Sequence, residues 1–309
     1  MTCCRTPTMV GSRRRSASSF GQRSPRRLVA DLETERGVGA HGADTDGSTE
    51  RTAADKNADR LSAAFRPGRP ALICYLPLGD SLGGEDLPEI YRECGVDILE
   101  IGVPGSDPYL DGKTISDSVR RARHAGVNLR RASEMIAGYR AAMPEMGMVW
   151  MTYPPDDPTG LVEAVAESGV DAFLTPMAAR NYVGLARQLG ERGVGFIHFL
   201  PHDPQLKDVR AAIESSSGYV MLQANPGPTG IKPVVLPDNR EVISMVRRLG
   251  LDTPVALGIG IGNAQQAREA VEMGADGIII GSLTVEALLK GRNRLVELLC
   301  SLREAIDGV

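Results

Sequence analysis

Three acidic residues lie close together in the stretch LEIGVPGSDPYLDGKTI, which covers residues 99–115. Glu100 stands in an otherwise apolar run, and Asp107 and Asp111 follow within one short loop rich in Gly and Pro. A carboxylate in a buried strand is costly to desolvate unless a partner or a chemical task compensates for it. The neighbouring apolar runs contain no basic residue that could pair with Glu100. We therefore expect Glu100 to have a chemical role.

The other candidates each have a structural alternative. Asp111 precedes a glycine, and Asp–Gly is a common turn dipeptide. Asp107 lies in Ser-Asp-Pro, where it could simply cap a turn. Tyr153 closes a later apolar run and could be ordinary core lining. His198 is expected to be a core histidine, and no spacing of His, Asp or Glu indicates a metal site.

Eight short apolar runs alternate with amphipathic helical stretches from residue 70 onward. Several helical stretches end in Gly just before the next run, as helix C-termini commonly do. Runs that are apolar throughout indicate strands buried on both faces, as in a parallel sheet. Eight such units in about 240 residues predict a (β/α)₈ TIM barrel, an α/β fold. The runs cover residues 71–76, 97–102, 148–153, 172–176, 195–200, 219–223, 254–259 and 277–282.

An open, doubly wound sheet is the structural alternative to this barrel. It is disfavoured because the first βα turn lacks the glycine-rich dinucleotide fingerprint. In a TIM barrel the catalytic groups lie at the C-terminal ends of the strands and in the loops that follow. That rule places Glu100, Asp111 and Tyr153 over one cavity.

Glycine-rich loops follow three consecutive strands on the far side of the predicted barrel. They read ANPGPTG (224–230), LGIGIGN (257–263) and IIGS (279–282), and the last places Ser282 at a helix start. Glycines let backbone N–H groups approach an anion, and a helix N-terminus favours negative charge. The sequence therefore predicts a phosphorylated substrate. No Walker-type sequence is present, so nucleotide hydrolysis is not implied.

Composition excludes several classes of protein. The net charge of −4 does not suggest a surface that binds nucleic acid. The sequence contains no run of about 18 apolar residues, so it predicts no membrane span. The five cysteines lack the spacing of a zinc site or a disulfide framework, which fits the reducing cytoplasm. We expect a cytoplasmic protein.

The first sixty residues differ in composition from the rest. Residues 1–30 contain seven arginines and no acid, and residues 31–60 turn acidic while remaining poor in large apolar side chains. Neither half can bury a core, so we expect residues 1–60 to be a disordered extension and residues 61–309 to form the catalytic barrel domain. An Arg- and Ser-rich, acid-poor N-terminus is also typical of a transit peptide for a plastid or another organelle.

At this point a family resemblance emerges from the residues themselves. The segment VDILEIGVPGSDPYLDGKTI resembles the second strand and following loop of the tryptophan synthase α chain family. Further landmarks occur in the same order over about residues 61–306. They are YLPLGD (75–80), MTY (151–153), GPTG (227–230) and GIGIGNAQQAREAVEMGADGIIIGS (258–282).

The resemblance implies a lyase that cleaves indole-3-glycerol phosphate to indole and glyceraldehyde-3-phosphate without a metal or organic cofactor. Glu100 matches the general acid/base that protonates indole C3 and helps to deprotonate the glycerol hydroxyl. Asp111 matches the carboxylate that binds the indole N–H. Tyr153 matches a tyrosine near these groups. Two separated carboxylates can divide this work because positive charge develops on the ring nitrogen while C3 gains a proton.

The resemblance also implies a phosphate cradle, a substrate pocket and a partner. Tyr75 and Met221 are assigned to the substrate pocket. The partner of the family is a pyridoxal-phosphate-dependent β chain, which becomes a candidate partner here. The residues that match the family's phosphate cradle are Gly230, Gly260, Gly281 and Ser282.

Several positions depart from the family pattern. Gly105 stands where the family usually has Phe or Tyr, Lys113 where it has Pro, and Met177 where it has Asp. Met221 replaces a substrate-lining Tyr, and the loop PPDDPTG after Tyr153 is shorter than usual. Most of these changes fall in loops that face the β chain in the family. They lead to the hypothesis of a divergent paralogue that releases indole or a related arene without stable pairing to an ordinary β chain.

Three other functions remain open from the sequence. The altered pocket walls suit a lyase or aldolase that cleaves a related phosphorylated substrate. A non-catalytic subunit that activates a β-type partner is a second alternative, although the retention of both Glu100 and Asp111 argues against it. A phosphate-binding isomerase would share the glycine loops but not the SDPxxDG loop.

Overall fold

Eight parallel strands form a closed barrel in the computed structural model, which describes residues 60–105, 109–153, 160–176, 183–249 and 252–309. Each strand pairs with the next, and β8 pairs with β1 to close the sheet. All eight predicted strands and the TIM-barrel fold are therefore confirmed. The strands are β1 (Ala71–Pro77), β2 (Ile98–Gly102), β3 (Gly147–Met151), β4 (Ala172–Leu174), β5 (Gly195–Leu200), β6 (Val220–Gln223), β7 (Val255–Gly258) and β8 (Gly277–Ile280).

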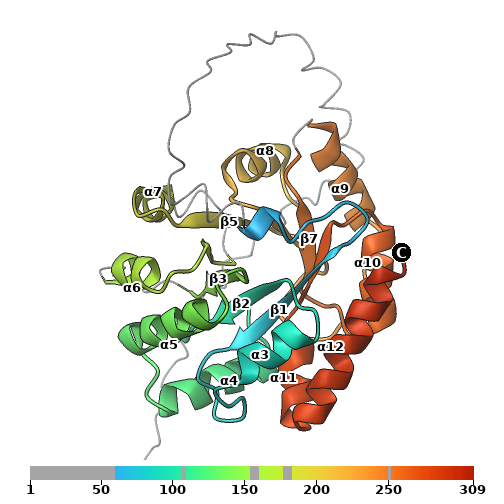
Figure 1. Ribbon diagram of the computed structural model, residues 1–309. Helices are drawn as coiled ribbons and strands as arrows, with labels where there is room; N and C mark the ends of the chain where they lie inside the picture. The colour runs from blue at the N-terminus through green and yellow to red at the C-terminus, as the bar shows by residue number, and fades with distance from the viewer. Residues whose placement is uncertain (1–59, 106–108, 154–159, 177–182, 250–251) are drawn as a thin grey trace, which may run out of the picture.

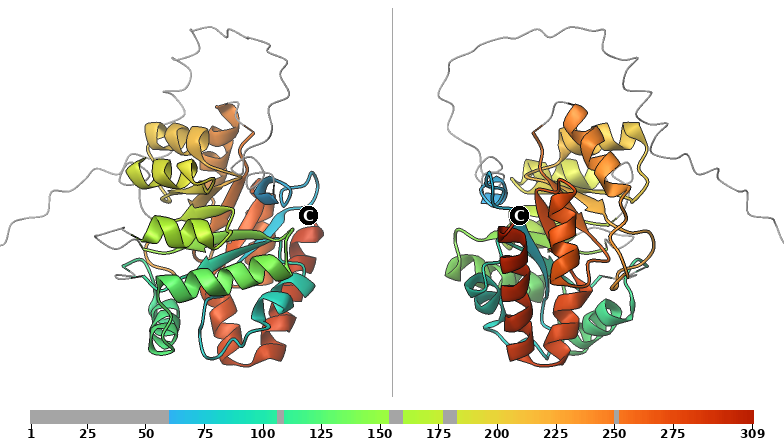
Figure 2. Two further views of the ribbon diagram at one scale, coloured as in Figure 1. Left: turned by 60° about the vertical axis from the view of Figure 1, so that its left-hand side comes forward. Right: turned by 90° about the vertical axis from the view of Figure 1, so that its right-hand side faces the viewer.

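Helices surround this barrel and follow the strands along the chain (Figures 1 and 2). Two helices, α11 and α12, come after β8, and α12 packs against both α10 and α11. The helices are α3 (Leu87–Glu93), α4 (Lys113–His124), α5 (Leu129–Ala142), α6 (Leu161–Glu167), α7 (Val183–Glu191), α8 (Leu206–Ser215), α9 (Asn239–Arg248), α10 (Ala264–Glu272), α11 (Ser282–Leu289) and α12 (Arg292–Asp307).

The strands bury apolar side chains on both faces, as their unbroken apolar runs predict. Successive residues of a strand point to opposite faces. Ile73 therefore joins the core inside the barrel, together with Val149 and Ile197, whereas Leu72 and Trp150 belong to the layer between barrel and helices. An inward-facing polar residue is thus surrounded by apolar neighbours and is poorly hydrated.

Glycines end four of the helices immediately before a strand, as expected from the sequence. Gly95, Gly169, Gly193 and Gly274 all have positive φ, between 74° and 103°. That backbone conformation suits glycine and stops a helix so that the chain can turn into the next strand. These turns set where β2, β4, β5 and β8 begin.

Ion pairs close the face of the barrel where the strands begin. Asp97 precedes β2, pairs with Arg69 and Arg303, and accepts a hydrogen bond from the backbone N–H of Leu72. Asp171, immediately before β4, is fully buried and pairs with Arg60 and Arg140. Charged groups at this end of a TIM barrel serve stability, which leaves the opposite end for chemistry.

Some expectations concern segments that are not described. The predicted disordered extension of residues 1–60 lies outside the described residues except for Arg60. The same holds for Asp107, for Met177 and for most of the loop after Tyr153. Within the described ranges, no helix is long and apolar enough to cross a membrane.

Candidate active site

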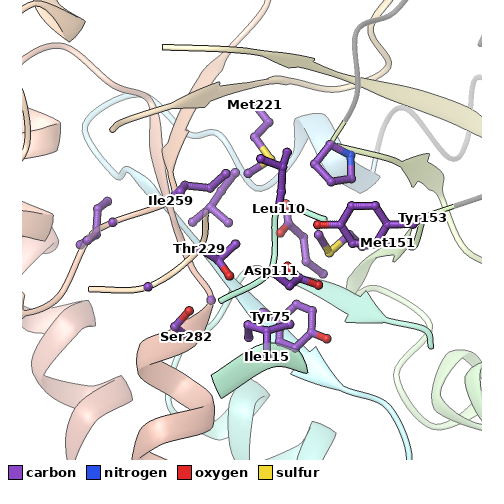
Figure 3. Close-up of a pocket in the computed structure, with 17 residues that line it drawn as sticks. Tyr75, Leu110, Asp111, Ile115, Met151, Tyr153, Met221, Thr229, Ile259 and Ser282 are labelled. Atoms are coloured by element: carbon purple, nitrogen blue, oxygen red, sulfur yellow. The ribbon is translucent and has the colours of Figure 1, made fainter. Parts of the chain in front are cut away.

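One pocket at the C-terminal end of the barrel strands contains every residue predicted to act in the site. Figure 3 shows Asp111 with the side chains of Tyr75, Tyr153 and Thr229 around it. The residues come from loops and strands that are up to 207 positions apart, and the closed barrel brings them together. The predicted residues that line the pocket are Tyr75, Glu100, Asp111, Tyr153, Met221, Gly230, Gly260, Gly281 and Ser282. Their chemical roles stay predictions.

Glu100 lies in β2 with its carboxylate inside the barrel and is only 2% exposed. Its Oε1 accepts a 3.0 Å hydrogen bond from the Tyr219 hydroxyl, and its surroundings are otherwise mainly apolar. Burial raises the pKa of Glu100 to about 7, and the hydrogen bond from Tyr219 limits the rise. Near neutral pH the side chain exists in both protonation states, so it can give and take a proton.

Asp111 lies in the loop after β2 and lines the same pocket as Glu100. Burial raises the pKa of Asp111 to about 6, and the nearby Tyr153 and Thr229 side chains limit this rise. Asp111 Oδ1 and the Tyr153 hydroxyl are buried, and neither makes a hydrogen bond of normal geometry among the described residues. A buried polar atom without a partner costs about 1–3 kcal/mol. Both atoms are therefore available to a ligand.

Tyr153 follows β3 and remains a neutral hydroxyl, because burial and the Asp111 carboxylate both raise its pKa. The ring of Tyr109 packs edge-on against Tyr153 at a centroid distance of 5.2 Å. The Tyr109 hydroxyl donates a 3.0 Å hydrogen bond to the carbonyl of Pro176, beyond β4. These contacts join the ends of β2, β3 and β4 into one wall of the pocket.

The departure at Gly105 has a structural explanation. A Cβ at Gly105 would lie 2.7 Å from the backbone oxygen of Tyr153 and 3.0 Å from Thr152 Oγ1. The loop after β2 therefore lies directly against the end of β3, and a Phe or Tyr at Gly105 would push it away. Lys113, another departure, begins α4 and pairs with Asp117 one turn later.

Thr229 fastens the loop after β6 to the loop that carries Asp111. Its backbone N–H donates a 2.7 Å hydrogen bond to the Leu110 carbonyl, and its Oγ1 accepts a 2.8 Å hydrogen bond from the Gly112 N–H. The two bonds flank Asp111 on both sides along the chain. The position of the Asp111 carboxylate therefore depends on a residue more than a hundred positions away.

The glycine-rich loops form the opposite side of the pocket. Ser282 is the first residue of α11, and its Oγ is buried without a hydrogen-bond partner among the described residues. The first N–H groups of a helix have no partner within the helix and attract anions. Gly230, Gly260 and Gly281 bring backbone close to the same space. This arrangement suits a phosphate group.

Ile259 marks a strained point in this cradle. It lines the pocket between Gly258 and Gly260 and has a φ of 65°, the only positive φ of a non-glycine residue in the described chain. A β-branched side chain in this conformation costs about 1–3 kcal/mol. Such strain is characteristic of sites where the backbone itself binds a ligand.

The match to known families agrees with this geometry. The family model for the tryptophan synthase alpha chain matches residues 61–305. The chain belongs to the tryptophan synthase alpha chain family. It is therefore a lyase of tryptophan biosynthesis, as the sequence resemblance implied.

Individual alpha chains are similar along nearly their whole length. The tryptophan synthase alpha chain of Marinobacter nauticus is 32% identical over 263 residues, which cover 81% of this chain and 97% of that relative. The alpha chain of Haloferax volcanii is 31% identical over 75% of this chain and 85% of its own length. A solved structure of Mycobacterium tuberculosis tryptophan synthase superposes with a TM-score of 0.70 and 28% identity, covering 84% of this chain and 99% of that chain.

Sequence reasoning missed two residues that hold this site together. Tyr219 lies just before β6, two positions before Met221, so the period-two alternation of strands places both inside the barrel. That alternation could have identified Tyr219 as a neighbour of Glu100. Thr229 was noted only as part of the GPTG motif, and no local signal reveals that it bonds to Leu110 and Gly112.

Proposed function

We propose that the chain cleaves indole-3-glycerol phosphate to indole and glyceraldehyde-3-phosphate, with Glu100 and Asp111 as its reacting carboxylates. The observation that carries this proposal is the pairing, in one pocket, of two carboxylates with raised pKa values and a glycine-rich cradle. The family to which the chain belongs points to the same reaction. The cleavage is a retro-aldol reaction that uses no metal or organic cofactor.

Glu100 acts at the bond that breaks. In its protonated form it delivers a proton to indole C3, which gives an indolenine-like ring with positive charge at the nitrogen. The resulting carboxylate accepts the proton of the neighbouring glycerol hydroxyl as the C–C bond breaks and the aldehyde forms. Glu100 thus ends the cycle protonated again. A pKa of about 7 suits both steps because neither form is strongly favoured at neutral pH.

Asp111 acts at the indole nitrogen. With a pKa of about 6 it is mainly ionised at neutral pH, so its carboxylate accepts a hydrogen bond from the ring N–H and stabilises the positive charge that develops there. The unpartnered Oδ1 is the atom available for this bond. Tyr153, held neutral beside it, positions the carboxylate through its hydroxyl.

The cradle and the apolar walls hold the two ends of the substrate. The Ser282 hydroxyl and the backbone around Gly230, Gly260 and Gly281 receive the phosphate. Tyr75 and Met221, which are 5% and 3% exposed, contact the aromatic ring deeper in the barrel. Fixing both ends places C3 near Glu100 and the ring nitrogen near Asp111.

A pyridoxal-phosphate-dependent β-type chain is the proposed partner. Tryptophan synthase alpha chains act with such a partner, and apolar side chains are exposed on loops around the mouth of this barrel. Tyr109, Ile231 and Val234 are 51%, 46% and 52% exposed there. An exposed apolar rim favours a protein contact. We place the pair in the cytoplasm and assign no nucleic-acid or membrane contact to it.

Indole release by the purified chain tests the proposal. The chain alone is incubated with indole-3-glycerol phosphate, with Glu100→Gln as the control. Turnover of about 1 s⁻¹ or more, abolished in the variant, establishes a self-sufficient lyase. Activity that appears only after a β chain is added supports the partnership. If no indole is released either without or with a β chain, the proposed substrate is wrong. The chain would then cleave a related phosphorylated compound or act as a non-catalytic activating subunit.

A further inference from the structure

The described side chains that line the pocket provide no positive charge to balance a ligand that carries phosphate. Its lining side chains include the two carboxylates Glu100 and Asp111, but no Lys, Arg or His occurs among the described residues that line it. A phosphate monoester adds about 1.5–2 negative charges at neutral pH. The N-terminus of α11 offsets only about half a charge. A cation close to the cradle would therefore strengthen binding considerably.

Lys232 is held directly beside this cradle. It lies in the loop between β6 and α9, and its backbone N–H donates a 3.0 Å hydrogen bond to the Gly260 carbonyl. The Gln266 side chain donates to the carbonyls of Lys232 and Pro233 at 3.0 and 2.9 Å. Three hydrogen bonds thus fix the base of the lysine side chain against the loop that contains Gly260.

The Lys232 side chain runs along Gly260 and ends in a free ammonium group. A Cβ at Gly260 would lie only 2.7 Å from Lys232 Cγ. The ammonium lies near Gly227, at 3.9 Å from the position that a Cβ would occupy there. Among the described residues, Lys232 forms no ion pair with a carboxylate. Its flexible end is therefore available to an anion.

Asn225 approaches Gly260 from the same side. It is 4% exposed, and its Nδ2 has no hydrogen-bond partner among the described residues. A Cβ at Gly260 would lie 2.6 Å from this Nδ2. A buried amide donor without a partner is costly, and native proteins rarely tolerate it without a reason. Gly260, with a φ of 110°, thus leaves room for both side chains.

We propose that Lys232 and Asn225 complete the phosphate site, Lys232 with a positive charge and Asn225 with a neutral N–H donor. The inference rests on the proposed function for the identity of the substrate, but phosphate binding itself requires no cleavage. The backbone cradle then fixes the position of the phosphate, whereas these two side chains set the strength and the charge preference of binding.

A purely structural role for Lys232 makes a different prediction. If Lys232 only holds its loop in place, its backbone hydrogen bonds and its apolar stem are sufficient, and its ammonium group does not contribute to phosphate binding. Lys232→Met keeps the stem and removes the charge, and Lys232→Arg restores the charge. Lys207→Met is the matched control, because Lys207 is exposed on α8 and makes none of the contacts that hold Lys232 beside Gly260.

Calorimetric titration of the full chain with inorganic phosphate tests the inference directly. We expect Lys232→Met to weaken phosphate binding about 10-fold, the effect of losing one charge-assisted hydrogen bond. Lys232→Arg should stay within about 3-fold of the wild type, and Lys207→Met should match it. Asn225→Asp should weaken phosphate binding at least as much as Lys232→Met does, since it replaces an N–H donor by a negative charge. Added NaCl should reduce binding more steeply in the wild type than in Lys232→Met.

Kinetics with indole-3-glycerol phosphate separate binding from chemistry. In Lys232→Met the KM should rise by the same factor as the phosphate Kd, with kcat within about 2-fold, because the interaction exists before and during the reaction. Unchanged phosphate affinity in Lys232→Met, or no phosphate binding by the wild type, overturns the inference. Weakened phosphate binding together with no turnover by the wild type leaves this inference intact and refutes the proposed substrate.

Discussion

The Tyr219 hydroxyl donates a 3.0 Å hydrogen bond to Glu100 Oε1 across the interior of the barrel. Tyr219 is fully buried, and burial together with the Glu100 carboxylate raises its pKa. Its proton therefore stays on the phenol oxygen and is always available to the carboxylate. The bond stabilises the ionised form of Glu100 against the cost of burial. Tyr219 thus limits the rise in the pKa of Glu100 that burial causes, although Tyr219 does not line the pocket.

Tyr219→Phe should move the pH dependence of cleavage to higher pH. Removal of the donor destabilises ionised Glu100, so its pKa should rise from about 7 by roughly one unit. At high pH, kcat/KM falls as Glu100 loses its proton, and the midpoint of this fall should move up by the same amount. Rate measurements between pH 5 and 10 test this, with Tyr139→Phe on α5 as the control. An unchanged midpoint would show that Tyr219 does not tune Glu100.

Glu100→Gln should stabilise the fold relative to the wild type at alkaline pH. The pKa of Glu100 is raised from 4.5 to about 7 in the folded chain. The raised pKa contributes stability that is fully present below pH 4.5 and is lost as pH rises through 7. A shift of this size corresponds to about 3 kcal/mol. Between pH 5 and pH 8 the difference in unfolding free energy should change by about this amount in favour of Gln.

Urea unfolding measures this difference, with the fluorescence of the single, buried Trp150 as the probe. Glu214→Gln, at an exposed position of α8, serves as the control and should show no such pH dependence. A constant difference between wild type and Glu100→Gln across this range would mean that burial does not raise the pKa of Glu100.

Asp111→Asn should lower kcat by about 10²–10³-fold with little change in KM. The amide keeps the size of the side chain but loses the charge that stabilises the ring nitrogen in the transition state. Asp117→Asn on α4 is the control, because Asp117 lies outside the pocket and pairs with Lys113. Steady-state kinetics would contradict the assignment if the KM rose and kcat did not change.

Gly112→Ala should reduce kcat/KM by about 10²-fold or more. A Cβ at Gly112 would collide with the backbone oxygen of Thr229 and break the bond between the Gly112 N–H and Thr229 Oγ1. Asp111 would then be displaced from the pocket. Gly138→Ala is the matched control, since Gly138 lies within α5 with open space around it and the change should add up to about 1 kcal/mol of stability. Equal activity of both variants would exclude a positioning role for this contact.

The order of strands and helices was predictable because each unit carries its own local pattern. Apolar runs, amphipathic helices and the glycine that ends a helix all act over a few residues. The ends of the strands were less predictable. The run at 97–102 begins as a strand only at Ile98, and the Asp97 carboxylate just before it binds Arg303 and the Leu72 N–H. β4 ends at Leu174, two residues before the predicted end.

The site was predictable where a residue type conflicts with its surroundings. Glu100 and Asp111 stand out because charge is unusual in an apolar run or beside one. Tyr219 does not stand out, because a tyrosine in an apolar run resembles ordinary core. The bonds of Thr229 to Leu110 and Gly112 depend on how two distant loops meet. Only the closed barrel brings those loops together.

The last helix ties the beginning of the barrel to its end. Arg303 of α12 donates 2.9 Å hydrogen bonds to Asp97 and to the Pro70 carbonyl, just before β1, and β1 pairs with β8. The C-terminus therefore lies beside the start of the first strand (Figure 1). In chain order, the ring of eight units is interrupted only between α12 and β1. A circular permutant of the barrel, in which a linker joins the end of α12 to the start of β1 and the new ends lie in another loop on that same face of the barrel, should form an identical pocket.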